Sequence, residues 1–221
     1  MEKSQKISLV VLIPIIFVTS VSCYTLQHLI GTMSVPDCGI GDRLQELTGS
    51  LDAYFLENGR AANIVLGIIS LWYDFCIALI IIRSFTQMTI RPYLSLFIFF
   101  ALRQTLQLTV GLPIPEGIIW HDPGILSFFI FYGVSHDLYF SAQTGISLLC
   151  VSEFMRIGKP WMTKIAFGFF LFLLLTVIVF RIHYTTDVYT AILSAFLSTY
   201  LSQKWAPTLD ETFARFARRI K

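Results

Sequence analysis

The composition of the chain excludes an ordinary soluble domain. Of its 221 residues, 55% are hydrophobic and 14% are charged, whereas about a quarter of the residues of a soluble domain are charged. The formal net charge of +2 is too small to indicate a nucleic-acid partner, and the sequence shows no groove of interleaved basic and aromatic residues. We therefore expect an integral membrane protein.

Six apolar stretches follow one another along the chain, at residues 7–30, 62–82, 93–111, 138–155, 162–180 and 186–203. Each is close to the ~20 residues with which a helix crosses a bilayer. The predicted fold class is all-α, with residues 1–221 forming a single domain, an integral membrane bundle of six transmembrane helices. The first stretch also fits a cleaved signal peptide, but its apolar character continues to Ile30, so we expect it to be retained.

The distribution of Lys and Arg predicts the orientation of this bundle. Cytoplasmic segments of membrane proteins carry the excess of these residues. Here the excess lies in the N-terminus, the second and fourth loops and the C-terminal tail, as Lys3, Lys6, Arg83, Arg91, Arg156, Lys159, Lys164, Lys204, Arg215, Arg218, Arg219 and Lys221. We therefore expect both termini to be cytoplasmic.

The tail over residues 207–221 places Phe213, Phe216 and Ile220 along one helical stripe, with arginines elsewhere. This pattern predicts a basic amphipathic helix on the membrane surface. A frayed basic terminus that only fixes the orientation is the alternative.

Ionisable residues inside predicted spans are costly in hydrocarbon and usually have a partner or a function. The second span contains Asp74 and the third contains Arg103, and an ion pair between them would satisfy both charges. The outer half of the third span carries further polar residues, Gln104, Thr105, Gln107 and Thr109. This half is too polar to face lipid, so we expect it to line a cavity that opens to the non-cytoplasmic face.

Two further polar segments lie at the same predicted face. The fourth span opens with HDLYFSAQTG, which supplies His136, Asp137, Ser141, Gln143 and Thr144. The last loop, RIHYTTDV, places His183 and Asp187 four residues apart, a spacing that puts both side chains on one helix face. A carboxylate can fix the tautomer of an imidazole and turn its other nitrogen into a nucleophile or base. Arg181 would hold an anion beside this pair, and a phosphate-bearing lipid head group is the expected substrate.

These segments resemble the sphingomyelin synthase family, the six-span branch of the lipid phosphate phosphatase superfamily. The motifs that carry the resemblance are HYTTDV at 183–188, HDLYFSAQTG at 136–145 and LRQTLQLTVGLPIPEG at 102–117, with Pro36 and Asp37 similar to a Pro-Asp element of the first loop. The resemblance implies that His183 attacks the phosphorus of a choline-type phospholipid and forms a phosphohistidine, oriented by Asp187. A lipid alcohol, either ceramide or diacylglycerol, would then accept the head group.

The polar residues of these segments supply the remaining expected site residues. We expect substrate contacts from Arg103, Arg181, Ser141, Thr144, His136, Asp137 and Tyr184. We expect no metal ion and no other cofactor. The site would lie on the non-cytoplasmic face, which is the periplasmic side of a bacterial inner membrane or the lumenal side of a eukaryotic one.

The sequence departs from the Ser-Gly-His-Thr motif of the family, because Ala142 and Gln143 stand where the family has Gly and His. An amide can donate a hydrogen bond to phosphate but cannot transfer a proton at neutral pH, and the loss of a positioned acid/base commonly costs about 10²–10⁴ in rate. Three explanations are open: an engineered His-to-Gln variant, a natural member with lost or altered activity, or a proton relay through His136.

Two other functions compete with head-group transfer. In a lipid phosphate phosphatase or a phospholipase-C-like hydrolase, water would replace the acceptor alcohol, but we do not find the Lys- and Arg-rich motif that precedes the His motifs of the phosphatases. Gln143 supports a catalytically silent lipid-binding protein or lipid transporter, whereas the intact HYTTDV segment argues against it, because a protein that only binds has no need of an oriented imidazole. The residues predict neither choline over ethanolamine nor ceramide over diacylglycerol, and they leave the oligomeric state open.

Overall fold

The computed structural model describes residues 9–30, 40–130, 132 and 139–220. Over these residues it contains eight helices and no strand, which confirms the all-α prediction. The helices are α1 (Leu9–Ile30), α2 (Arg43–Leu47), α3 (Gly49–Glu57), α4 (Gly59–Gln87), α5 (Arg91–Thr109), α6 (Ala142–Ile157), α7 (Pro160–Val179) and α8 (Thr185–Ile220).

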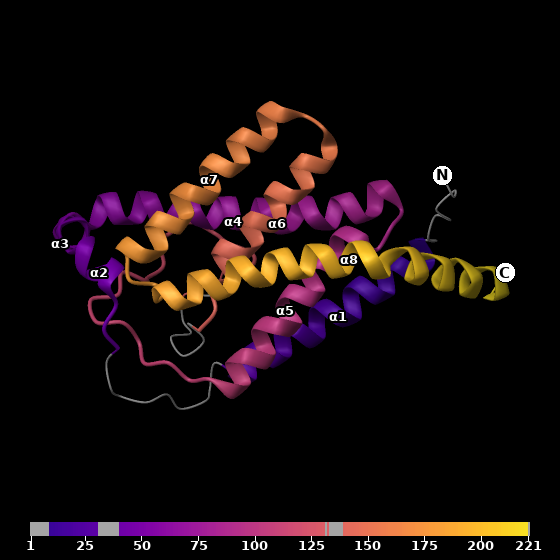
Figure 1. The fold of residues 1–221 in the computed structure, drawn as a ribbon, viewed down its shortest axis with the longest axis horizontal. Helices are drawn as coiled ribbons and strands as arrows, with labels where there is room; N and C mark the ends of the chain where they lie inside the picture. The colour runs from indigo at the N-terminus through magenta and orange to yellow at the C-terminus, as the bar shows by residue number, and fades with distance from the viewer. Residues whose placement is uncertain (1–8, 31–39, 131, 133–138, 221) are drawn as a thin grey trace.

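The long helices pack around α6, which contacts α4, α5, α7 and α8 (Figure 1). α6 and α7 form an antiparallel hairpin, and α5 packs along α8 with α1 on its other side. Helix-ending residues separate these elements. Gly158 ends α6 in the left-handed conformation (φ 74°) and Pro160 starts α7 at its first turn, the usual positions of these two residue types.

Three of the described helices are long and apolar enough to cross a membrane, namely α1 over Leu9–Leu29, α4 and α7. The expectation of six spans is therefore confirmed for three. α6 has only 16 residues, because Phe140 adopts a left-handed φ of 73° and the helix starts four residues later than the predicted 138. α5 and α8 are less apolar because they bury polar side chains against the bundle, among them Gln104, Ser198 and Ser202.

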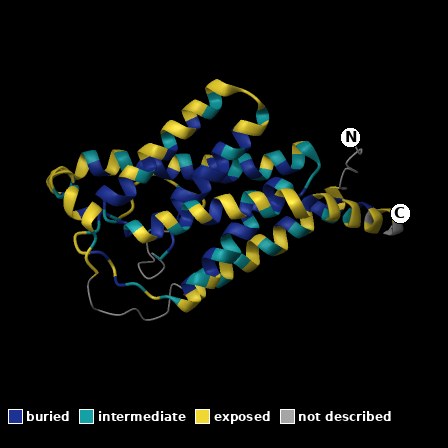
Figure 2. Ribbon diagram, viewed as in Figure 1, coloured by how far each residue is buried: buried dark blue, intermediate teal, exposed yellow. Residues whose placement is uncertain are grey.

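Large apolar side chains are exposed on several helices, whose exposed residues are yellow in Figure 2. Large side chains such as Val10, Phe17, Ile64 and Leu175 are more than half exposed on α1, α4 and α7, where a soluble protein would place polar residues. This surface is compatible with the integral membrane protein that the composition predicts. α8 continues without a break to Ile220, so residues 207–220 extend the last predicted span as one helix.

The segment that follows α5 folds back against the middle of α4. Asp74 accepts hydrogen bonds from Ser127 Oγ (3.0 Å), Phe128 N (2.9 Å) and Phe129 N (3.2 Å). Asp74 lies 15 residues from Gly59, so at ~1.5 Å per residue this contact is ~22 Å along α4. The predicted ion pair between Asp74 and Arg103 is wrong for these described residues, because loop backbone satisfies the carboxylate instead.

Candidate active site

The site is built around a short turn, residues 180–184, which joins α7 to α8. The turn bonds to the end of α7, where Val177 O accepts a hydrogen bond from Ile182 N (3.0 Å). A second backbone bond runs from Ile119 N to Phe180 O (2.8 Å). His183 is 2% exposed, so the turn carries the imidazole into the bundle.

His183 lies between Asp187 and Gln143. Its Nδ1 is 3.9 Å from Asp187 Oδ2, which is too long for a direct hydrogen bond. Because α8 starts at Thr185, His183 precedes the helix, and Asp187 Oδ2 instead accepts a hydrogen bond from Tyr184 N (3.0 Å). His183 Nε2 is 3.0 Å from Gln143 Oε1. Nε2 donates in this arrangement, since a carbonyl oxygen only accepts.

Polar side chains of α5 hold neighbouring segments around this pair. Arg103 donates from Nε to Phe140 O (3.1 Å) and also bonds to Gln27 of α1. Gln107 Nε2 donates to Tyr139 O (3.1 Å). The expectation for the polar outer half of the third predicted span is therefore confirmed for Gln104 and Gln107, which are buried in the protein, and Gln104 lines the cavity described below. Thr105 and Thr109 are exposed instead, and their hydroxyls donate to the backbone of α5.

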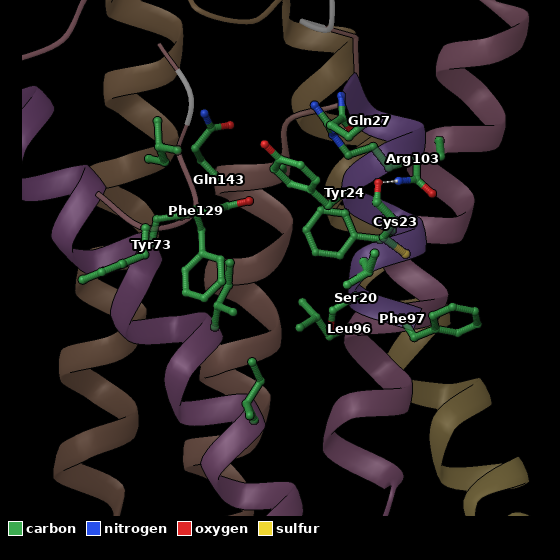
Figure 3. A pocket seen from close by; sticks show the side chains of 18 of the residues that line it. Ser20, Cys23, Tyr24, Gln27, Tyr73, Leu96, Phe97, Arg103, Phe129 and Gln143 are labelled. Carbon is green, nitrogen blue, oxygen red and sulfur yellow. Dashed lines mark hydrogen bonds between the residues drawn. The ribbon is translucent and has the colours of Figure 1, made fainter. Parts of the chain in front are cut away.

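A cavity of about 540 Å³ extends from His183 and Gln143 into the apolar interior. Its walls come from α1, α4, α5, the segment 120–130 and the start of α6. Figure 3 shows Gln143, Arg103 and Gln27 at one end, with Leu96 and Phe97 further along the cavity. One polar end and a long apolar body match the shape of a lipid, and the volume is within the ~300–1,000 Å³ range of small-molecule sites.

The cavity is accessible from the side of the bundle. Phe17 of α1 and Phe128 line it and are 68% and 71% exposed.

Arg181 and Tyr184 are not among the residues that line this cavity. Arg181 Nε is 2.9 Å from Asp52 Oδ2 of α3, and Arg181 Nη1 donates to Glu116 O (2.8 Å). Ser141 and Thr144 are fully buried and bond to each other through their hydroxyls (2.9 Å) at the start of α6. His136, Asp137, Pro36 and Asp37 lie outside the described residues.

A comparison with protein families assigns the chain to a known group. A family model described as AtPDCT1/2 matches residues 42–204, well over half of the chain. The chain belongs to the AtPDCT1/2 family. This is a family of phosphatidylcholine:diacylglycerol cholinephosphotransferases. The match is not to sphingomyelin synthase, so that resemblance stays a prediction. No curated protein and no solved structure matches the chain.

The AtPDCT1/2 match begins at a residue that the sequence analysis missed. Asp42 Oδ2 accepts a hydrogen bond from Thr185 N (2.5 Å), and Asp42 Oδ1 accepts one from Thr185 Oγ1 (2.7 Å). Gln45 Nε2 donates to His183 O (3.1 Å). An Asp directly before RLQEL is a signal for a helix N-cap, but it does not show that the same carboxylate meets a residue far along the chain.

Proposed function

We propose that the protein transfers phosphocholine from phosphatidylcholine to diacylglycerol, with His183 as the nucleophile. The observation that carries the proposal is the position of His183 at the polar end of an apolar cavity, in a chain of the AtPDCT1/2 family. Membership of the family supports this type of reaction, a phosphocholine transfer between a phospholipid and diacylglycerol. It also favours diacylglycerol over ceramide as the acceptor.

The proposed reaction has two steps. A ring nitrogen of His183 attacks the phosphorus of phosphatidylcholine, and the phosphorus–oxygen bond to diacylglycerol breaks with its electron pair on the leaving oxygen, which takes up a proton. The hydroxyl of a second diacylglycerol then attacks the phosphohistidine, gives up a proton and releases His183. Protons taken up and released balance over the cycle. Asp187, 3.9 Å from Nδ1, stabilises positive charge on the ring.

Gln143 has to move for this attack. Its carbonyl oxygen contacts the ring nitrogen that faces the cavity (3.0 Å), and a nitrogen that donates a hydrogen bond there has no free lone pair. We infer that the lipid phosphate displaces the amide and that the ring proton moves from Nε2 to Nδ1, the nitrogen that faces Asp187, which leaves the lone pair of Nε2 free to attack. The NH₂ group of Gln143 then donates to a phosphoryl oxygen. Arg103 lines the same cavity, and its guanidinium supplies the positive charge that a phosphodiester requires.

The membrane arrangement that we propose adds α5, α6 and α8 to the three apolar helices, giving six spans. Arg83, Arg91 and Arg156 lie at the end of the bundle away from His183, whereas Arg181 lies in the turn of His183. Arg91 and Glu153 form an ion pair at this end (2.6 Å), where α4 ends, α5 starts and α6 ends. By the distribution of positive charge this end is cytoplasmic, so the His183 end faces the periplasm or a lumen.

Gln143 favours one alternative, a lipid-binding protein without turnover. An amide cannot carry the proton that the leaving diacylglycerol needs. If no other group supplies this proton, the cavity would bind phosphatidylcholine and leave it intact. Hydrolysis by water is a second outcome that the same assay detects, as release of free phosphocholine.

The test uses purified protein in liposomes that contain head-group-labelled phosphatidylcholine and a diacylglycerol of distinct acyl mass, with ceramide as competitor. We expect the label to appear in phosphatidylcholine that carries the acyl chains of the added diacylglycerol. The Gln143→His variant should form this product faster than the wild type. His183→Ala should abolish transfer, also in the Gln143→His background. The exposed His121 is the matched control, and His121→Ala should keep the activity.

Two outcomes would contradict the proposal. Transfer that persists in the variant with both His183→Ala and Gln143→His would exclude His183 as the nucleophile. Absence of transfer and hydrolysis in both the wild type and Gln143→His would favour lipid binding alone.

A further inference from the structure

We propose that α2 and α3 clamp the turn that carries His183, with Asp42, Gln45 and Asp52 as positioning residues. The inference rests on the proposed function, because it assigns these residues a role in presenting His183 to phosphorus. α2 and α3 lie at the same end of the bundle as the start of α8 (Figure 1). None of the three residues lines the cavity, so they act on the lipid only through the turn.

The clamp bonds to the turn on both sides of the imidazole. After His183, the Asp42 carboxylate accepts hydrogen bonds from Thr185 N (2.5 Å) and Thr185 Oγ1 (2.7 Å). At His183 itself, the carbonyl oxygen accepts a hydrogen bond from the buried Gln45 (3.1 Å). The backbone of His183 is thus fixed to α2 independently of its side chain.

Asp42 links two helix starts through one carboxylate. It caps α2 by accepting from Leu44 N (3.0 Å) and Gln45 N (3.4 Å), while it bonds to Thr185 at the start of α8. A negative charge is favourable at both helix N-termini. Partial burial raises the pKa of Asp42, but the hydrogen bonds from Thr185, Gln45 and Leu44 together outweigh burial and hold the pKa below its usual value. Asp42 is therefore charged at neutral pH.

Before His183, the clamp holds a residue in an unfavourable backbone conformation. Arg181 has a φ of 52°, in the left-handed region that L side chains rarely adopt. Such residues persist where surrounding structure over-determines them, often at functional sites. Here Asp52, which is 4% exposed, lies 2.9 Å from Arg181 Nε, and Glu116 O accepts from Nη1 (2.8 Å). Arg181 therefore shapes the turn.

Positioning predicts a specific kinetic effect. A displacement of ~1 Å at a reacting group can cost ~10²-fold in rate, whereas lipid binding depends on the cavity walls, which the clamp does not form. Loss of a clamp contact should lower kcat and leave the KM for phosphatidylcholine unchanged. A residue that only stabilises the fold would lower the amount of active protein and leave the kcat of each folded molecule unchanged.

The experiment compares Asp42→Asn, Thr185→Val and their combination, each normalised to folded protein. We expect either single change to lower kcat about ten- to a hundredfold. The combination should lower kcat by less than the product of the two, since both changes weaken the same pair of contacts between Asp42 and Thr185. Thr185→Ser keeps both hydrogen bonds and should keep kcat. Glu46→Gln, an exposed position of α2, is the matched control.

A second readout does not depend on turnover. Diethyl pyrocarbonate modifies accessible neutral imidazoles, and mass spectrometry gives its rate at each histidine. His183 is 2% exposed in the clamped turn, whereas His121 is exposed and serves as the internal reference. Asp42→Asn and Thr185→Val should both raise the rate at His183 several-fold and leave the rate at His121 unchanged.

The two readouts separate failure of the clamp from failure of the proposed function. If the wild type transfers no head group, even with Gln143→His, the function is wrong, and modification of His183 still tests the clamp. An unchanged modification rate in both variants would overturn the clamp. A raised KM at constant kcat would also overturn it, because it would place Asp42 or Thr185 in lipid binding.

Discussion

Replacing Asp74 by alanine should release the loop that folds back against α4. The carboxylate accepts hydrogen bonds from two loop amides, Phe128 N (2.9 Å) and Phe129 N (3.2 Å), and from the Ser127 hydroxyl (3.0 Å). Inside a bilayer no water replaces a lost acceptor. Asp74→Ala thus leaves two backbone donors unsatisfied, whereas Asp74→Asn keeps one carbonyl oxygen for them.

The magnitude follows from these contacts. Phe128 and Phe129 are exposed residues that would face lipid, where an unsatisfied donor costs at least as much as a buried one, about 1–3 kcal/mol. Two such donors lower the free energy of unfolding by about 2–6 kcal/mol in Asp74→Ala. Asp74→Asn should lose roughly half of that amount. Because Phe129 lines the cavity, Asp74→Ala should also reduce head-group transfer. Asp122→Asn, at an exposed cap in the same loop, is the control and should change stability little.

The assay is reversible unfolding in mixed micelles by a denaturing detergent, followed by tryptophan fluorescence. Double-mutant cycles with Ser127→Ala and with Arg103→Gln identify the partner of Asp74. We expect a coupling energy of about 0.5–2 kcal/mol with Ser127 and less than about 0.5 kcal/mol with Arg103. The reverse result, strong coupling to Arg103 and none to Ser127, would restore the ion pair that the sequence suggests and refute the loop contact.

Three further predictions concern packing, charge and pH. A Cβ on Gly145 would lie 2.0 Å from the ring of the fully buried Phe99, so Gly145→Ala should lower the free energy of unfolding by about 1–3 kcal/mol, and Phe99→Leu should restore part of it. Glu153 is 2% exposed and pairs with Arg91 (2.6 Å). Glu153→Gln removes this charge and should lower the free energy of unfolding by about 3–5 kcal/mol. The pKa of Asp42 is lower in the folded protein than its unfolded value of about 3.9, so the ionised carboxylate stabilises the fold. The difference in free energy of unfolding between wild type and Asp42→Asn should therefore stay constant above this pH and shrink as the pH falls below it.

Two exposed positions are controls for the first two of these variants. Gly168→Ala adds a Cβ with nothing within 4 Å, and it should not lower stability as Gly145→Ala does. Glu211 pairs with Arg215 at 3.6 Å on the surface, so Glu211→Gln should leave thermal stability unchanged. Equal losses at buried and exposed positions would contradict the packing and charge arguments.

Several properties of this protein follow from its sequence alone. The apolar composition and the length of its stretches predict membrane helices, since bilayer thickness fixes the number of residues per span. The HYTTDV segment identifies His183 and Asp187 as candidate site residues, and the polar half of α5 predicts a cavity. These features depend on residue type and near-neighbour spacing, which the sequence displays directly.

Only the tertiary structure decided which polar groups meet. Arg181 turns to Asp52 of α3, Asp74 bonds to a loop more than 50 residues away, and Asp42 bonds to Thr185. In an apolar medium every polar group needs a partner, so the sequence predicts that partners exist. The sequence does not identify these partners, because they depend on which helices and loops the tertiary packing brings together.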